Sequence, residues 1–263
     1  MDIISENQVN EDVIKEVSKA IAKESYDDLL KPTFSACGSI ISLPFRLIDA
    51  SLSGVKEWID KRNFNYEKTR KLLALKMLKV DESKIVQPDS YVAVPALQYL
   101  AYSYDSDELR DMYANLLASS MNIDLKYQVH PAFVEIIKQL CPDEAKLLNW
   151  LKDRDDQEVI DIHLEERDKN QYVIILVNFT DIADNICDCS QNISSYIENL
   201  ERLKIIQIIS DSIASDDGYN RLFNHKLIQE LRIEYETNEK KIKMIKKALC
   251  ITSFGKTFIN VCL

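Results

Sequence analysis

The segment Gly255-Lys256-Thr257 is the first place to look for chemistry, because it resembles the end of a phosphate-binding loop. Such a loop needs an earlier glycine, whose place is taken by Cys250, and a long βαβ unit around it. Neither requirement is met so near the last residue. We therefore expect no nucleotide cofactor here, and we interpret Gly255 as permitting a tight turn between the last strand and the last helix.

Metal chemistry would need cysteines and histidines at ligand spacing. Cys187 and Cys189 are spaced as C-x-C, whereas zinc ribbons use C-x-x-C. Cys141, His163 and His225 have no ligand-like spacing to them. The pattern predicts no metal site and no metal cofactor.

Acid–base or nucleophilic catalysis also lacks its usual pattern. His130 precedes Pro131, but no serine stands in a G-x-S-x-G elbow that would use a histidine as base. We interpret His130 as a residue that bonds the backbone at a helix start. Glu165 and Glu166 are adjacent on an expected strand, so they point to opposite faces and cannot act as a carboxylate pair. The sequence favours a protein that is not an enzyme.

The composition indicates which class of protein contains these residues. The 263-residue chain is 46% hydrophobic and has only 4 Gly and 6 Pro, which favours long helices. A formal charge of −10 disfavours generic binding of polyanions. The 6 cysteines show no disulfide framework and the N-terminus no signal-peptide pattern, so we expect free thiols and a cytoplasmic protein.

The N-terminal region, residues 1–80, is expected to form long helices over about 11–30 and 34–80. Its longest uncharged run, Pro32 to Phe45, has 14 residues, fewer than the ~20 that span a bilayer. The apolar stretch from Phe34 to Ile59 is expected to pack in a helical hairpin or an oligomer interface. A surface-lying, membrane-disturbing helix is the alternative. The residues expected to make either contact are Ile41, Phe45, Ile48, Leu52 and Trp58.

A central helical block is expected over residues 81–141. Asp105 and Glu108 have capping-box spacing, with Asp105 as the cap, and an apolar stripe from Leu109 to Met121 follows at helical spacing. A further helix is expected over about 132–140.

Residues 142–263 read as a small α+β part. We expect a helix over 143–152, a β-hairpin of 159–165 and 172–178, a helix over 190–204, and a strand over 205–209. A last strand at about 248–252 and a terminal helix over 254–263 complete it. The chain is thus expected to be mainly α, with a winged-helix-like C-terminal unit.

A run of lysines lies where a wing would, before the last strand. It comprises Lys240, Lys241, Lys243, Lys246 and Lys247. Contact with DNA is one use for them, but the expected reading helix over 190–204 carries two acidic and two basic residues, and a DNA reader needs positive charge there. Contact with a protein partner is therefore favoured.

Two long segments resemble a known family. They are VPALQYLAYSYDSDELRDMYANLLASSMN, from Val94 to Asn122, and VHPAFVEIIKQLCPDEAKLL, from Val129 to Leu148. The closing LCITSFGKTFINVCL is similar too. Together they resemble the Abi-alpha (abortive infection alpha) family of bacterial proteins. The resemblance implies a role in resistance to bacteriophage, and it carries no catalytic residues.

The sequence therefore predicts an antiphage protein of abortive-infection type that acts through protein contacts and without catalysis. Its expected partners are a protein or phage component and further copies of itself. Two alternatives stay open: a DNA-binding winged-helix regulator, and a membrane-disturbing effector that does not span the membrane.

Overall fold

The computed structural model describes residues 71–100, 103, 106–154, 156–167, 171–210 and 216–263. The candidate contact residues Ile41, Phe45, Ile48, Leu52 and Trp58 lie outside these ranges. None of the described helices is long and apolar enough to cross a bilayer. The chain divides into two compact units, one of Met1–Gln139 with Val261–Leu263 and one of Leu140–Asn260.

The described part of the first unit is helical. Residues 71–77 are helical, and they are followed by η1 (Glu82–Lys84), α6 (Ser90–Leu100), α7 (Asp107–Ser120), η2 (Lys126–Gln128) and α8 (Ala132–Lys138). α7 packs against both α6 and α8. Met112, Tyr113, Leu116 and Leu117 of α7 are fully buried, so the apolar stripe predicted there is confirmed.

The cap of α7 is Ser106 and not Asp105. The Ser106 hydroxyl accepts a hydrogen bond from the Leu109 backbone N–H at 3.2 Å and donates one to the Glu108 carboxylate at 2.9 Å. Serine caps a helix as well as aspartate does, so the neighbouring Ser106 can take the role predicted for Asp105. The helix begins one residue later than the predicted cap would require.

The second unit combines a sheet with short helices. Its elements are α9 (Pro142–Leu151), β1 (Gln157–Glu166), β2 (Tyr172–Phe179), η3 (Asp181–Asn185), η4 (Ser190–Asn192), α10 (Ile193–Arg202), β3 (Ile206–Ser210), α11 (Asp216–Phe223), α12 (Lys226–Tyr235) and β4 (Lys240–Ile251). α13 (Ser253–Cys262) begins in this unit and ends in the first. The mainly helical character with a small α+β part is confirmed, as is the predicted hairpin, here β1 and β2.

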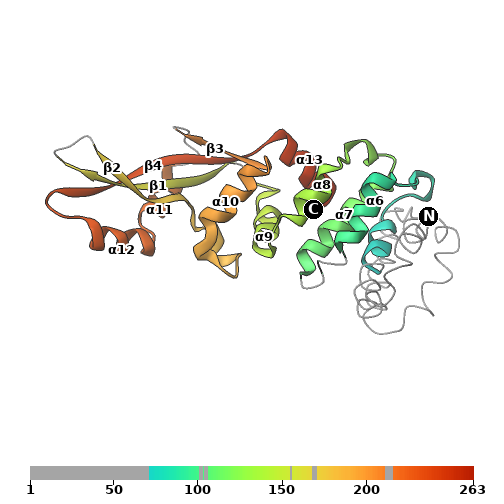
Figure 1. Ribbon diagram of the computed structural model, residues 1–263, viewed down its shortest axis with the longest axis horizontal. Helices are drawn as coiled ribbons and strands as arrows, with labels where there is room; N and C mark the ends of the chain where they lie inside the picture. The colour runs from blue at the N-terminus through green and yellow to red at the C-terminus, as the bar shows by residue number, and fades with distance from the viewer. Residues whose placement is uncertain (1–70, 101–102, 104–105, 155, 168–170, 211–215) are drawn as a thin grey trace, which may run out of the picture. The chain divides into compact units, whose positions relative to one another are not determined.

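The sheet is antiparallel, and its four strands have the order β2-β1-β4-β3. α11 contacts β1, α12 contacts β4, and α10 contacts both β2 and β3 (Figure 1). Residues 158–162 of β1 are all buried, which shows that both faces of the sheet are covered there. From residue 163 to 166, the same strand is only half-buried. The end of the sheet where β1 ends and β2 and β4 begin, called the far end below, is therefore more open to solvent.

The last strand is longer than predicted. It was expected to begin near Ala248, with the lysines before it in a wing, but β4 begins at Lys240. Its first residues pair with the end of β1, from Glu166↔Lys240 to His163↔Lys243. A run of lysines has low strand propensity, so pairing with the carboxylate-rich end of β1 overrides the local preference.

Candidate functional site

The five candidate lysines do not form one basic surface. Successive strand residues point to opposite faces, so Lys241, Lys243 and Lys247 share one face of β4, whereas Lys240 and Lys246 point to the other. Two faces of a sheet cannot contact one nucleic-acid backbone together. The five lysines that are close in the sequence therefore lie on two opposite faces of the sheet.

Three of these lysines are paired with carboxylates. Lys243 Nζ lies 2.7 Å from the Glu165 carboxylate and Lys241 Nζ lies 3.7 Å from it. The hydrogen bond from Lys243 holds the pKa of Glu165 below its ordinary value. Lys241 and Lys243 are half-exposed, and they can still reach a partner through the rest of their hydrogen-bonding capacity.

Lys247 is part of the interior. Its Nζ lies 2.5 Å from the Asp161 carboxylate and donates to the Asn178 side chain at 3.2 Å. Asp161 also accepts a hydrogen bond from the Asn178 backbone N–H at 2.8 Å. Asn178 has a φ of 51°, which a non-glycine residue rarely adopts, and this network holds it there. Lys247 is therefore a structural residue.

The other two lysines contact different neighbours. Lys246 Nζ lies 4.9 Å from the centre of the Tyr219 ring, in a cation–π arrangement, and Tyr219 donates a hydrogen bond to the Lys247 carbonyl. Lys240 lines a shallow hollow of about 310 Å³ at the far end of the sheet, together with Leu164, Glu166, Gln171, Tyr172 and Val173. Glu165 and Glu166 thus face different lysines, as their predicted opposite orientation requires.

On the other side of β1 from the paired lysines, β2 exposes apolar side chains. Tyr172, Val173 and Ile174 are 58%, 66% and 48% exposed. The Tyr172 ring stacks on His163 of β1, with centroids 4.5 Å apart and an interplanar angle of 2°. The sequence showed these residues only as half of a hairpin, because alternation along a strand does not reveal which end of a sheet the helices leave uncovered.

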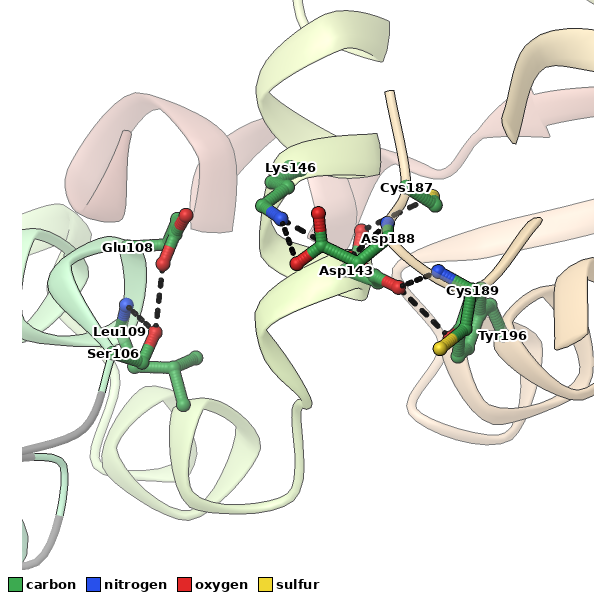
Figure 2. Close-up of polar contacts among 9 residues, drawn as sticks. All are labelled: Ser106, Glu108, Leu109, Asp143, Lys146, Cys187, Asp188, Cys189 and Tyr196. Carbon is green, nitrogen blue, oxygen red and sulfur yellow. Dashed lines mark hydrogen bonds and ion pairs between the residues drawn. The ribbon is translucent and has the colours of Figure 1, made fainter. Parts of the chain in front are cut away.

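A buried carboxylate holds the segment that contains the C-x-C pair. One oxygen of Asp143 accepts from the Asp188 backbone N–H, at 2.9 Å, and the other from the Cys189 N–H, at 2.9 Å, and from the Tyr196 hydroxyl, at 3.0 Å (Figure 2). Lys146 Nζ lies 3.3 Å from Asp143 and 2.8 Å from the exposed carboxylate of Asp188. The C-x-C segment therefore binds the Asp143 carboxylate through the backbone amides of Asp188 and Cys189.

The pKa of Asp143 reflects these donors. Burial raises it, but the two amides, the Tyr196 hydroxyl and the Lys146 ammonium stabilise the charged form more strongly, so the pKa lies below its ordinary value. Glu144 behaves differently, because burial dominates and raises its pKa despite hydrogen bonds from the Cys141 N–H and the Asn199 amide. The Cys-Pro-Asp-Glu segment thus fixes the start of α9 and the η3–η4 segment together.

Cys187 and Cys250 are poorly suited to nucleophilic chemistry. The described cysteines are free, with Cys189 exposed, Cys141 and Cys187 half-buried, and Cys250 and Cys262 buried. Burial, with the nearby Asp143 charge, raises the pKa of Cys187 to about 11. Burial also raises the pKa of Cys250 to about 11. A thiol with a raised pKa forms little thiolate, which is the nucleophilic species. Among the described residues, no group of three or more His, Cys, Asp or Glu could hold a metal ion.

Gly255 has a packing role that differs from the predicted turn. It lies inside α13 without a positive φ, and a Cβ at this position would lie 2.0 Å from the Ile205 carbonyl oxygen. Thr252 fixes the same junction: its hydroxyl donates to the Lys204 carbonyl at 2.6 Å and accepts from the Gly255 N–H at 2.9 Å. Glycine is needed for close backbone approach, and the turn interpretation was wrong.

His130 matches its predicted role. Its Nδ1 accepts a hydrogen bond from the Ala132 N–H at 3.1 Å, where α8 begins. The interpretation of this residue as one that bonds the backbone at a helix start is confirmed.

Residues 61–262 match the family model described as abortive infection alpha. The chain belongs to this family. The match includes the Cys-Pro-Asp-Glu segment at α9 and the Thr252 to Gly255 junction, so two of the segments that carry the family resemblance have structural roles.

No curated protein matches the chain significantly. A similar solved structure is that of an uncharacterized protein from the hydrocarbon-degrading marine bacterium Alcanivorax borkumensis SK2. It is 15% identical, covers 49% of this chain and 90% of its own length, and has a TM-score of 0.36.

Proposed function

We propose that the chain acts in antiphage defence of the abortive-infection type, and that it does so in the cytoplasm through protein contacts and not through catalysis. Membership of the abortive infection alpha family supports the defence role. The observation that supports contact is the exposed apolar stretch of β2, Tyr172 to Ile174, with the half-exposed Lys241 and Lys243 on the other side of β1. Exposed apolar residues rimmed by charged ones are typical of protein interaction sites.

Polar residues in and near the segments considered for chemistry support the non-catalytic part. His130 and Thr252 bond the backbone at helix starts, and the carboxylate of Asp143 is occupied by four donors. A residue whose hydrogen-bonding capacity is used by the fold has little left for a substrate.

An infection experiment tests this proposal. Cells that carry the chain should release fewer phage, and infected cells should not resume growth when phage outnumber cells. Lys256→Ala and Cys189→Ser, at exposed positions, should protect as well as the parent. Growth of the infected culture, or loss of protection in either variant at an unchanged protein level, would contradict abortive defence without catalysis.

DNA binding is the second candidate, and the exposure of Lys241 and Lys243 favours it. It treats residues 142–263 as winged-helix-like, with the helix predicted over 190–204, which includes α10, as the reading helix. However, the Glu201 carboxylate of α10 accepts from the Ile208 N–H at 2.9 Å, and Arg202 bonds Asn199. Binding should then be weak, without sequence preference, and lost at moderate salt. Tight binding to one operator would favour a regulator instead.

A further inference from the structure

At the far end of the sheet, β1 is paired on both sides, and directly opposite residues of antiparallel strands share one face of a sheet. Two neighbouring rows of three residues therefore lie on the same face. The first row is Tyr172, Glu165 and Lys241, and the second is Ile174, His163 and Lys243. The irregular pairing of β1 with β2 lies outside these rows, starting on the other side of His163. This six-residue surface is called the open face below.

The half of the open face on β2 is apolar. Tyr172 is 58% exposed and Ile174 is 48% exposed. The Tyr172 ring is nearly parallel to the His163 ring, on which it stacks. The stack restricts the tyrosine before a partner arrives, so less side-chain entropy is lost on binding. A tyrosine held in this way, with an aliphatic neighbour, is typical of the residues that anchor a protein interface.

The half of the open face on β4 is basic. The side chains of Lys241 and Lys243 are 51% and 53% exposed, and both ammonium groups lie near the single carboxylate of Glu165. With His163 counted as neutral, the open face therefore keeps one positive charge, on a chain whose net charge is −10. An ammonium group has three donors, so both lysines can bind a further acceptor without releasing Glu165.

We propose that the open face binds a segment of a partner protein that carries an apolar side chain and, at a distance set by the sheet, a carboxylate. β2 and β4 lie on either side of β1, and neighbouring strands are ~4.8 Å apart, so the two groups are ~10 Å apart. The apolar side chain packs on Tyr172 and Ile174, and the carboxylate accepts hydrogen bonds from Lys241 and Lys243. This inference rests on the proposed function, action by protein contact, and adds the chemistry of the partner.

Charge favours a protein segment over a nucleic acid on the open face. A single-stranded nucleic acid also combines flat rings with negative charge, but it brings one negative charge with every nucleotide. The open face offers one positive charge, and the net charge of −10 on the chain repels a polyanion. A single carboxylate matches the charge of the face. Ile174 adds an aliphatic surface, which a side chain covers without needing a flat ring.

Selection from a library of short random peptides displayed on yeast, with the full chain as bait, tests this chemistry. Peptides enriched by the parent should have Asp or Glu within about three residues of an aromatic or aliphatic one, since an extended chain covers ~10 Å in that length. The double variant Lys241→Glu, Lys243→Glu should enrich basic peptides instead. Lys226→Glu, Lys256→Glu is the matched control: it changes the net charge equally at two exposed positions, and it should enrich the same peptides as the parent.

Titration of one enriched acidic peptide onto the purified chains tests the apolar half. Tyr172→Ala should weaken binding about tenfold or more, as loss of an interface anchor does. Ile233→Lys, at a residue of α12 that is 84% exposed, should bind like the parent. If Tyr172→Ala does not fold by circular dichroism, Ile174→Ala takes its place. Equal binding by the parent and the folded β2 variant would overturn the role of the apolar half.

Other outcomes overturn the proposed partner itself. A parent that enriches no acidic peptides, or the same peptides as the charge-reversed chain, would do so. So would a fluorescent oligouridine that binds the parent more tightly than the best peptide at physiological salt, which would assign the open face to nucleic acid. Self-association of the parent through Tyr172 would assign it to a second copy. These are binding measurements, so their failure is distinct from failure of the defence role, which loss of protection in infected cells would show.

Discussion

Lys247→Met is expected to lower the free energy of unfolding by about 3 kcal/mol or more, because it leaves the Asp161 carboxylate buried without its cation. The Asp161 and Lys247 side chains are only 8% and 15% exposed, so water cannot replace the lost partner. The same substitution also removes the hydrogen bond to Asn178, which has a left-handed backbone conformation. Urea unfolding followed by circular dichroism measures the change.

Lys241→Met is the matched control on the same face of the same strand. Lys241 is about half exposed and 3.7 Å from Glu165, and such surface pairs contribute less than about 1 kcal/mol. Adding Asp161→Asn to Lys247→Met should recover part of the loss, since it removes the unpaired charge. Equal effects of the two lysine substitutions would contradict the division of the run into structural and exposed residues.

Asp143→Asn is the second change with a large expected effect, about 3 kcal/mol, since the buried site is built for a carboxylate that accepts four hydrogen bonds. The amide group can accept at one atom only, and its NH₂ would face donors. Asp188→Asn is the control: it removes another partner of Lys146, but the Asp188 side chain is 82% exposed. We expect it to cost less than about 1 kcal/mol.

The effect of Asp143→Asn should depend on pH. The folded pKa of Asp143 is depressed, so its stabilisation is present above the ordinary value of about 4 and is lost as pH falls through the folded pKa. The gap between parent and variant should therefore be full near neutral pH and should close below about pH 4. Glu144, whose pKa is raised, opposes this trend equally in both proteins. A gap that widens in acid would contradict the assignment.

Hydrophobic patterning was enough to predict much of the fold. The buried face of α10, with Ile193, Ile197 and Leu200, and the β1–β2 hairpin both follow from helical and alternating spacing of apolar residues. The start of β4 could not be found this way. Its lysines become strand residues only because β1 lies beside them with Glu165 and Glu166 at matching positions, and that pairing is set by tertiary structure.

The candidate site was predicted less well for a similar reason. The lysines were visible as a run, but whether each is buried, paired or exposed depends on residues such as Asp161 and Tyr219, which lie far away in the sequence. Asp143 gave a weak signal, since Glu144 stands three residues after Cys141 at capping-box spacing. Nothing local indicated that Asp143 would bind the amides of the C-x-C segment.

The central claim, that this member of the abortive infection alpha family acts by contact through the exposed apolar stretch of β2, is tested most directly by phage yield per infected cell. Cells should carry the parent, Ile174→Lys or Ile233→Lys at equal protein levels, with folding verified on the purified chains. The account predicts a low yield with the parent and with Ile233→Lys, and a yield close to that of unprotected cells with Ile174→Lys. A yield with Ile174→Lys as low as with the parent would contradict it.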